Sequence, residues 1–169
     1  MTNITLGNYP KYVQGYLDLV KEDDLTTAYK NQLPVIKELL DNITEEKANY
    51  AYAPGKWTIK ELLQHIIDAE RIFGFRALCF ARKDTTELPG FEEDDYASNS
   101  NANLRTWQSL KEEFFAVRTA TEMLFKSFTP EALTSSGVAN RNTSSVISIG
   151  FLTVGHLQHH INILKERYL

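Results

Sequence analysis

The chain has 169 residues, 43% of them hydrophobic, and a formal net charge of −4 from 18 Lys and Arg against 22 Asp and Glu. This length and composition predict one domain over residues 1–169, with residues 1–22 as an N-terminal extension. Because the basic residues form no cluster and no apolar run is long enough to span a bilayer, we expect neither a nucleic-acid partner nor a membrane partner.

The sequence also indicates the compartment and the kind of metal ligand that is available. Its N-terminal stretch lacks the basic and apolar regions of a signal peptide. Its one cysteine, Cys79, has no partner for an internal disulfide. We therefore expect a cytoplasmic protein in which histidine and carboxylate side chains would hold any metal. Cys79 has no evident activating base and is expected to pack as a small hydrophobic residue.

Apolar residues recur every three to four positions in four long segments, which predicts helices over residues 23–42, 58–82, 103–127 and 144–168. Pro34 lies inside the first segment and is expected to kink that helix or make it restart. The second segment opens with Thr58-x-x-Glu61, a capping-box pattern typical of a helix N-terminus.

Three connections join these helices, over residues 44–57, 83–102 and 128–143, and none shows the alternation of a strand. The pattern predicts an all-α four-helix bundle with long connections. The length of the 83–102 connection favours a topology other than plain up-down, and long loops of this kind often carry function.

All four histidines fall in the second and fourth predicted helices. His156 and His160 are one turn apart within the apolar arc of the fourth helix, and His65 borders the apolar face of the second. If these two helices are neighbours, the three imidazoles converge inside the bundle. Neutral imidazole nitrogens suit Zn²⁺, Ni²⁺ or similar ions, so the pattern predicts a divalent metal held by these three residues.

A buried histidine can instead be hydrogen-bonded to a backbone carbonyl without any metal. Burying two or three imidazoles without partners would cost about 1–3 kcal/mol each, which favours a shared partner such as a metal. The residues between His156 and His160 are Leu-Gln-His, so the catalytic glutamate of the HExxH zinc proteases is missing. His159 falls on the polar flank and is expected at the surface or behind the ligands.

Two carboxylates and several aromatic residues are further candidates. Asp68, three residues after His65, faces the polar side and is either a proton acceptor or an ordinary solvated acid. Glu70 lies at the edge of the apolar arc, where an ion pair with an arginine is expected. The aromatic candidates for lining a substrate pocket lie in or beside the connections and are Trp57, Phe91 and Tyr96.

Several stretches together resemble the DinB-like family of metal-dependent enzymes, namely Ala53–Arg71, Leu88–Phe91, Asp95-Tyr96 and Gly155–Leu169. The resemblance spans nearly the whole chain from about Asp24. It implies a four-helix bundle with a divalent metal held by one histidine of the second helix and two of the fourth, which match His65, His156 and His160. Characterised relatives in the wider superfamily include bacillithiol and mycothiol S-transferases and a mycothiol-dependent maleylpyruvate isomerase. Many other members have no known reaction. The resemblance therefore defines the metal site better than it defines the activity.

Three protein ligands would leave coordination positions open, as in catalytic rather than structural metal sites. The leading hypothesis is a thiol-dependent S-transferase, in which the ion holds a small-molecule thiol as thiolate and presents it to an electrophilic substrate. The first alternative is a hydrolase with water in the open position. The second is a non-catalytic bundle whose metal is structural or absent and whose surface serves oligomerisation or ligand sequestration. A fourth protein ligand such as His159 or Asp68 would close the metal site and favour this alternative. A bundle of this size can also form a homodimer.

Overall fold

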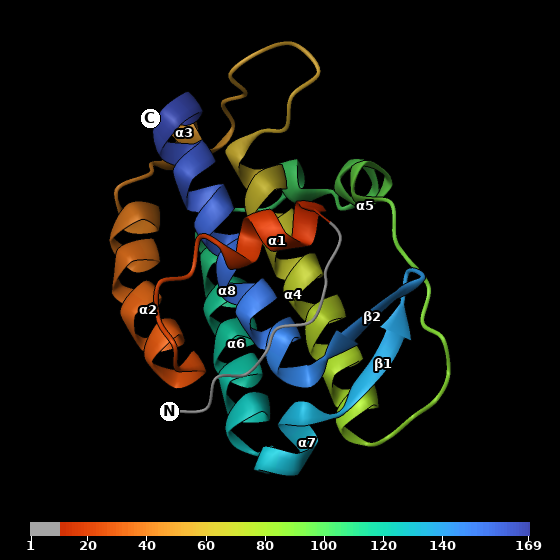
Figure 1. Cartoon of the computed structure of the whole chain (residues 1–169). Helices are drawn as coiled ribbons and strands as arrows, with labels where there is room; N and C mark the ends of the chain where they lie inside the picture. The colour runs from red at the N-terminus through yellow and green to blue at the C-terminus, as the bar shows by residue number, and fades with distance from the viewer. Residues whose placement is uncertain (1–10) are drawn as a thin grey trace.

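The computed structural model describes residues 11–169, which form four long helices joined by short helices and one small β-hairpin (Figure 1). The long helices are α2 (Leu25–Asp41), α4 (Ile59–Ala81), α6 (Trp107–Lys126) and α8 (Val146–Ile163). The shorter elements are α1 (Lys11–Leu17), α3 (Glu45–Ala48), α5 (Glu93–Asn99), the 3₁₀ turn η1 (Ala102–Leu104), α7 (Pro130–Thr134), β1 (Ser136–Ala139), β2 (Asn142–Ser145) and the π-helical turn η2 (Leu164–Tyr168). The predicted all-α four-helix bundle is confirmed.

A polar side chain caps the N-terminus of each long helix. α4 begins at Ile59, as the capping box predicts, whereas α2 begins at Leu25 rather than at residue 23 and α6 begins at Trp107 rather than at residue 103. Thr58 accepts a hydrogen bond from the backbone N–H of Glu61, and the Glu61 carboxylate accepts one from the backbone N–H of Thr58. This is the predicted capping box. The corresponding caps of the other three long helices are Asp24, Thr106 and Ser145. Each cap satisfies a backbone donor that the helix itself cannot pair.

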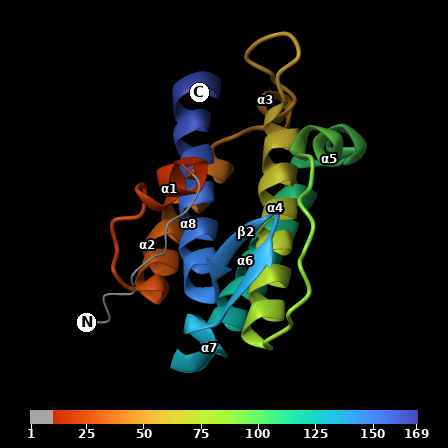
Figure 2. The same ribbon diagram turned by 45° about the vertical axis from the view of Figure 1, so that its right-hand side comes forward.

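The chain does not follow plain up-down topology. The 83–102 connection returns the chain to the end of the bundle at which α4 begins, so α4 and α6 run in the same direction (Figures 1 and 2). α4 packs against both α6 and α8, and α2 packs against α8 and α6. The two histidine-bearing helices, α4 and α8, are therefore direct neighbours.

The 128–143 connection was expected to lack strands, and that expectation is wrong. β1 pairs antiparallel with β2, so α8 begins at Val146 rather than at residue 144. Asn140 and Arg141 form the turn with φ angles of 49° and 61°. Two-residue hairpin turns need this left-handed conformation, which asparagine tolerates better than most residues. The strands are short and largely polar, so they carry no hydrophobic alternation.

Pro34 does not make the first long helix restart, because α2 is one element from Leu25 to Asp41. A proline inside a helix removes one hydrogen bond and costs about 3 kcal/mol. Residues on both sides of it are buried in the core, with exposed fractions of 1% for Ala28 and Ile36 and 0% for Leu40. This burial of the helix on either side of Pro34 offsets the lost hydrogen bond.

Part of the expected N-terminal extension packs directly on the bundle. α1 lies against α8, and the approach is close at Gly155, where an added Cβ would lie 2.1 Å from the carbonyl oxygen of Tyr16. A glycine at this position therefore allows the two backbones to meet. Residues 1–10 of the extension lie outside the described residues.

Two apolar clusters fill the two ends of the bundle, and buried polar side chains lie between them. On α2, α6 and α8 the gap between the clusters is occupied by Gln32, Arg118 and His156, whose exposed fractions are 7%, 3% and 6%. A layer of buried polar side chains, which includes His156, thus separates the two apolar clusters of the core. None of the helices in the described part of the chain is sufficiently long and apolar to cross a membrane.

Candidate metal centre

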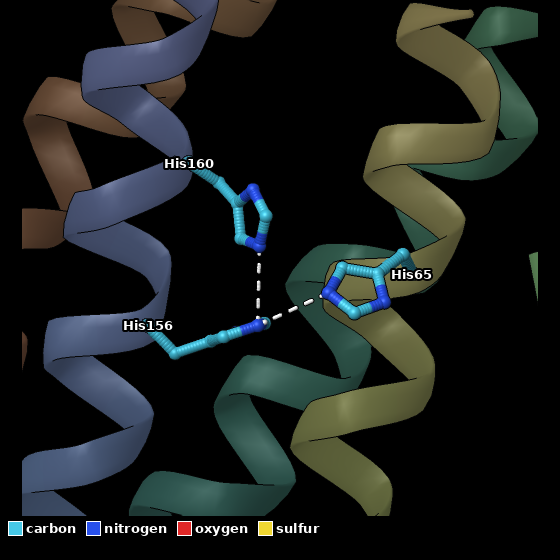
Figure 3. A group of neighbouring side chains, drawn as sticks. All are labelled: His65, His156 and His160. Carbon is cyan, nitrogen blue, oxygen red and sulfur yellow. Dashed lines mark hydrogen bonds between the residues drawn. The ribbon is translucent and has the colours of Figure 1, made fainter. Parts of the chain in front are cut away.

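Three imidazole rings from α4 and α8 meet inside the bundle (Figure 3). Nε2 of His156 lies 3.1 Å from Nε2 of His65 and 3.1 Å from Nε2 of His160. One ring nitrogen from each residue lies within 4.8 Å of the other two. The structure therefore brings together the three histidines that the sequence pattern singled out.

Aromatic neighbours hold these imidazoles in place. The ring of Trp57 lies 4.8 Å from that of His65, measured between centroids. Tyr16 and Phe73 pack edge-on against His156 at 5.5 and 5.6 Å. Because Tyr16 belongs to α1, the close contact of α1 with α8 also places one wall of the site.

Burial keeps all three imidazoles neutral at physiological pH. It lowers the pKa of His65 to about 4, against a smaller opposing effect of the Asp94 carboxylate. Burial also lowers the pKa values of His156 and His160 well below the usual range, and the neighbouring imidazoles lower them further. Neutral imidazole is the form that offers a lone pair to a metal ion.

The donor set fits a divalent ion. Bonds of about 2.1 Å in tetrahedral geometry separate two ligand nitrogens by roughly 3.4 Å, close to the two 3.1 Å separations found here. The Nδ1 atoms of His65 and His160 are buried and have no hydrogen-bond partner within the described chain, so both rings direct their polar contacts through Nε2. One proton on His156 Nε2 cannot satisfy both neighbours, whereas a cation can accept all three lone pairs.

A cavity of about 380 Å³ opens beside His65 and His156. Glu93, the first residue of α5, also lines it, and its Oε2 atom lies 3.9 Å from Nε2 of His65. Partial burial and the adjacent acids Asp94 and Glu92 raise the pKa of Glu93. Sequence reasoning missed this carboxylate because it follows a long connection and has no helical spacing relative to the histidines. The nearest sequence signal is the acidic run directly after Phe91.

The aromatic candidates divide between the cavity and its surroundings. Phe91 lines the cavity. Tyr96 packs against Phe91 at 5.2 Å but is 47% exposed and lies outside the cavity lining. Trp57 also lies outside the lining, and its ring contacts that of His65. His159 is half-buried against Tyr16 and does not join the three converging nitrogens.

The two candidate acids of α4 face elsewhere. Asp68 accepts a hydrogen bond of 2.9 Å from Nε2 of Gln64 and lies 3.8 Å from Nη1 of Arg71, so its contacts are with a polar network that contains no histidine. Glu70 forms a 2.8 Å ion pair with Arg118, and both side chains are 3% exposed. The arginine partner expected for Glu70 is present. Cys79 is buried, as expected for a residue that packs as a hydrophobe.

Comparisons with known proteins agree with this architecture. The sequence profile of one family, described as the DinB superfamily, matches residues 28–164. No curated protein matches the sequence. Among solved structures, YfiT from Bacillus subtilis, described as a probable metal-dependent hydrolase with an unusual four-helix bundle topology, matches with a TM-score of 0.66 and 14% identity over 94% of this chain and 87% of that chain. At this identity the likeness shows a shared fold.

Proposed function

The chain belongs to the DinB superfamily, and from this premise we propose that it is a metal-dependent enzyme in which His65, His156 and His160 hold a divalent ion. The observation that carries the proposal is the convergence of three buried, neutral imidazoles beside a cavity large enough for a small organic molecule. Zn²⁺ and Ni²⁺ are the ions that best match three imidazole ligands. Three protein ligands leave room for a nucleophile, which favours a catalytic over a structural role.

The reaction would begin with deprotonation of a nucleophile in the cavity. A bound divalent ion supplies Lewis acidity, which lowers the pKa of a thiol or a water molecule. Glu93 is the proton acceptor, since its Oε2 atom faces His65 at 3.9 Å and its side chain remains in contact with solvent. Its raised pKa brings the carboxylate closer to the operating pH, where a general base is most effective. The solvent contact allows Glu93 to release the proton again.

A thiol is the first candidate for the nucleophile. The resemblance to the DinB-like family supports it, because thiol S-transferases are among the characterised relatives in the wider superfamily. The aromatic and aliphatic cavity walls suit an organic electrophile as the second substrate. The thiolate would attack an electrophilic carbon, forming a C–S bond while the leaving group departs with its electron pair. Phe73 and Phe91 would hold the electrophile and exclude bulk water.

Water is the second candidate, which would make the protein a hydrolase. Two observations favour it, the carboxylate of Glu93 beside the histidines and the description of YfiT as a probable metal-dependent hydrolase. Glu93 would accept a proton from water as the water oxygen attacks the carbonyl carbon of an ester or amide. The C–O or C–N bond to the leaving group would then break, and Glu93 would return the proton to the departing alcohol or amine.

Two assays on the metal-loaded protein distinguish these nucleophiles. The first follows conjugation of cysteine to 1-chloro-2,4-dinitrobenzene, and the second follows hydrolysis of 4-nitrophenyl acetate without thiol. S-transfer predicts metal-dependent turnover in the first assay, and hydrolysis predicts it in the second. Across a panel of thiols, electrophiles and esters, a loaded protein that turns over none contradicts the enzyme proposal.

Replacing Glu93 tests its role as proton acceptor. We expect Glu93→Gln to lower turnover by about 10²-fold or more, because an acid–base group typically contributes that much, while metal content stays unchanged. Glu87→Gln is the matched control, since it removes the same charge from an exposed residue of the same connection that does not line the cavity. Equal turnover in the two variants would exclude Glu93 as the base.

A further inference from the structure

The imidazole of His65 is oriented by ring packing rather than by a hydrogen bond. A metal-binding histidine usually donates its second ring N–H to a carboxylate, a backbone carbonyl or water, and this contact fixes the rotation of the ring. Nδ1 of His65 is buried and has no hydrogen-bond partner among the residues that the structure describes. The orientation of His65 therefore depends on the rings that pack against it.

Trp57 is the closest of these rings. Its centroid lies 4.8 Å from that of His65, and the two ring planes are inclined by 41°. The imidazoles of His156 and His160 follow at 5.0 Å each, and both belong to the metal centre itself. Trp57 immediately precedes Thr58, the N-cap residue of α4. It therefore packs on His65 from the 49–58 connection, outside the helix that carries this ligand.

A tyrosine of η2 holds the backbone of Trp57. The hydroxyl group of Tyr168 donates a 2.8 Å hydrogen bond to the carbonyl oxygen of Trp57. The Tyr168 side chain is 4% exposed, and the ring of Tyr52 packs edge-on against it at 4.9 Å. The 49–58 connection and η2 lie at the same end of the bundle (Figure 1). Because packing confines the Tyr168 ring, its hydrogen bond restrains the chain at Trp57.

The same helical segment that carries Tyr168 also supplies two of the three candidate ligands. η2 directly continues α8, which bears His156 and His160. One continuous segment therefore provides two imidazoles and, through Tyr168 and Trp57, contacts the third. We infer that Tyr168 is a positioning residue of the metal centre, which holds Trp57 against His65 and so fixes this imidazole relative to the two of α8. The inference rests on the proposed metal site, and Tyr168 itself does not line the cavity.

Competition with the chromophoric chelator 4-(2-pyridylazo)resorcinol measures the Zn²⁺ affinity of the full-length protein and two variants. Tyr168→Phe removes only the hydroxyl group that holds Trp57. Tyr52→Phe is the matched control, because it removes a hydroxyl group from the same aromatic cluster, where the partner is Nη1 of Arg167 at 3.1 Å. We expect Tyr168→Phe to bind Zn²⁺ about 10-fold more weakly, as removal of a group that orients a ligand predicts, and Tyr52→Phe to bind it as wild type does. Wild-type affinity in Tyr168→Phe, or equal losses in both variants, overturns the inference.

A double-variant cycle distinguishes positioning through Trp57 from a general loss of structure. Trp57→Leu removes the indole ring that packs on His65 but keeps the carbonyl group to which Tyr168 donates. In this background, Tyr168→Phe should have no further effect on the Zn²⁺ affinity, because the ring that it holds in place is gone. A further loss of about 10-fold in the double variant would show that Tyr168 acts by another route, and it would overturn the inference.

Proton magnetic resonance of metal-free protein separates this inference from the proposed function. The ring current of Trp57 shifts the ring-proton signals of His65, which are assigned by their absence in His65→Gln. We expect Tyr168→Phe to move these signals toward their positions in Trp57→Leu, and Tyr52→Phe to leave them unchanged.

The two failures then have different signatures. A wild-type protein that binds no Zn²⁺ contradicts the proposed function, whereas the shift of the His65 signals in Tyr168→Phe would still support the placement of His65 by Tyr168. His65 signals that stay at their wild-type positions in Tyr168→Phe overturn the inference, even if the protein binds Zn²⁺.

Discussion

Replacing Gly155 with alanine would force α1 away from α8 beside the candidate metal centre. The added Cβ would lie 2.1 Å from the carbonyl oxygen of Tyr16 and 2.6 Å from its carbonyl carbon. Both atoms belong to the backbone, so no side-chain rotation relieves the contact. Ordinary van der Waals contact begins near 3.4 Å, and α1 must therefore move by more than about 1 Å.

Two opposing terms set the expected loss of stability. Overpacking costs about 1–3 kcal/mol, and replacing a glycine inside a helix with alanine returns about 0.5–1 kcal/mol. We expect the free energy of unfolding to fall by about 1–2 kcal/mol. Because the Tyr16 ring lies 5.5 Å from that of His156, the same displacement should also open the cavity wall.

Urea denaturation and hydrogen exchange measure these two effects. The free energy of unfolding should fall, and the amides of α1 should exchange faster than in wild type. Gly74→Ala is the matched control, because its nearest contact would be Leu124 Cδ2 at 3.9 Å, and this variant should be neutral or up to about 1 kcal/mol more stable. Wild-type stability and unchanged exchange of α1 in Gly155→Ala would refute the close contact.

Three further predictions address the buried ion pair of Glu70, the dependence of stability on pH, and the role of Asp68. Glu70→Ala should lower the free energy of unfolding, measured in urea, by about 3–5 kcal/mol, because it leaves Arg118 buried without its counter-ion. The double variant Glu70→Leu/Arg118→Met should recover most of this loss. A single variant that is as stable as the double variant would contradict the reasoning. Metal-free protein should lose stability as the pH falls from about 6.5 toward 4, because the unfolded chain binds a proton at His65 in this window and the folded chain does not. His65 should account for about 3 kcal/mol of this loss in the free energy of unfolding. Urea titrations of His65→Gln across the same pH range should therefore show a correspondingly smaller loss than wild type. If the free energy of unfolding falls equally steeply with pH in both proteins, the pKa of His65 is not depressed. Asp68→Asn should leave metal content and turnover unchanged, since Asp68 contacts Gln64 and Arg71, and a loss of metal would show that it supports the site.

Local patterns were sufficient to predict the four long helices and to single out the three histidines that the structure brings together. The capping box at Thr58 fixed the register of α4, and the four-residue spacing of His156 and His160 fixed their common face. Helical periodicity also placed His65 toward the core. These signals lie within single helices, so they could be detected without knowledge of the packing.

The features that were missed depend on contacts between distant segments. The hairpin lacked hydrophobic alternation, and its one local signal was the asparagine at the turn, Asn140. Glu93 reaches the cavity only because the 83–102 connection folds back along α4. The contact of α1 with α8 joins Tyr16 to Gly155, and a glycine inside an apolar helix was the only hint of it.

Metal analysis of purified full-length protein and single histidine variants tests the central claim most directly. The protein, prepared without chelator, is analysed by inductively coupled plasma mass spectrometry beside His65→Ala, His156→Ala, His160→Ala and the control His159→Ala. We predict one divalent ion per chain in wild type and in His159→Ala, and its loss in the other three variants. A wild-type protein that binds no divalent ion even after supplementation, or a full complement of metal in His156→Ala, would contradict the account.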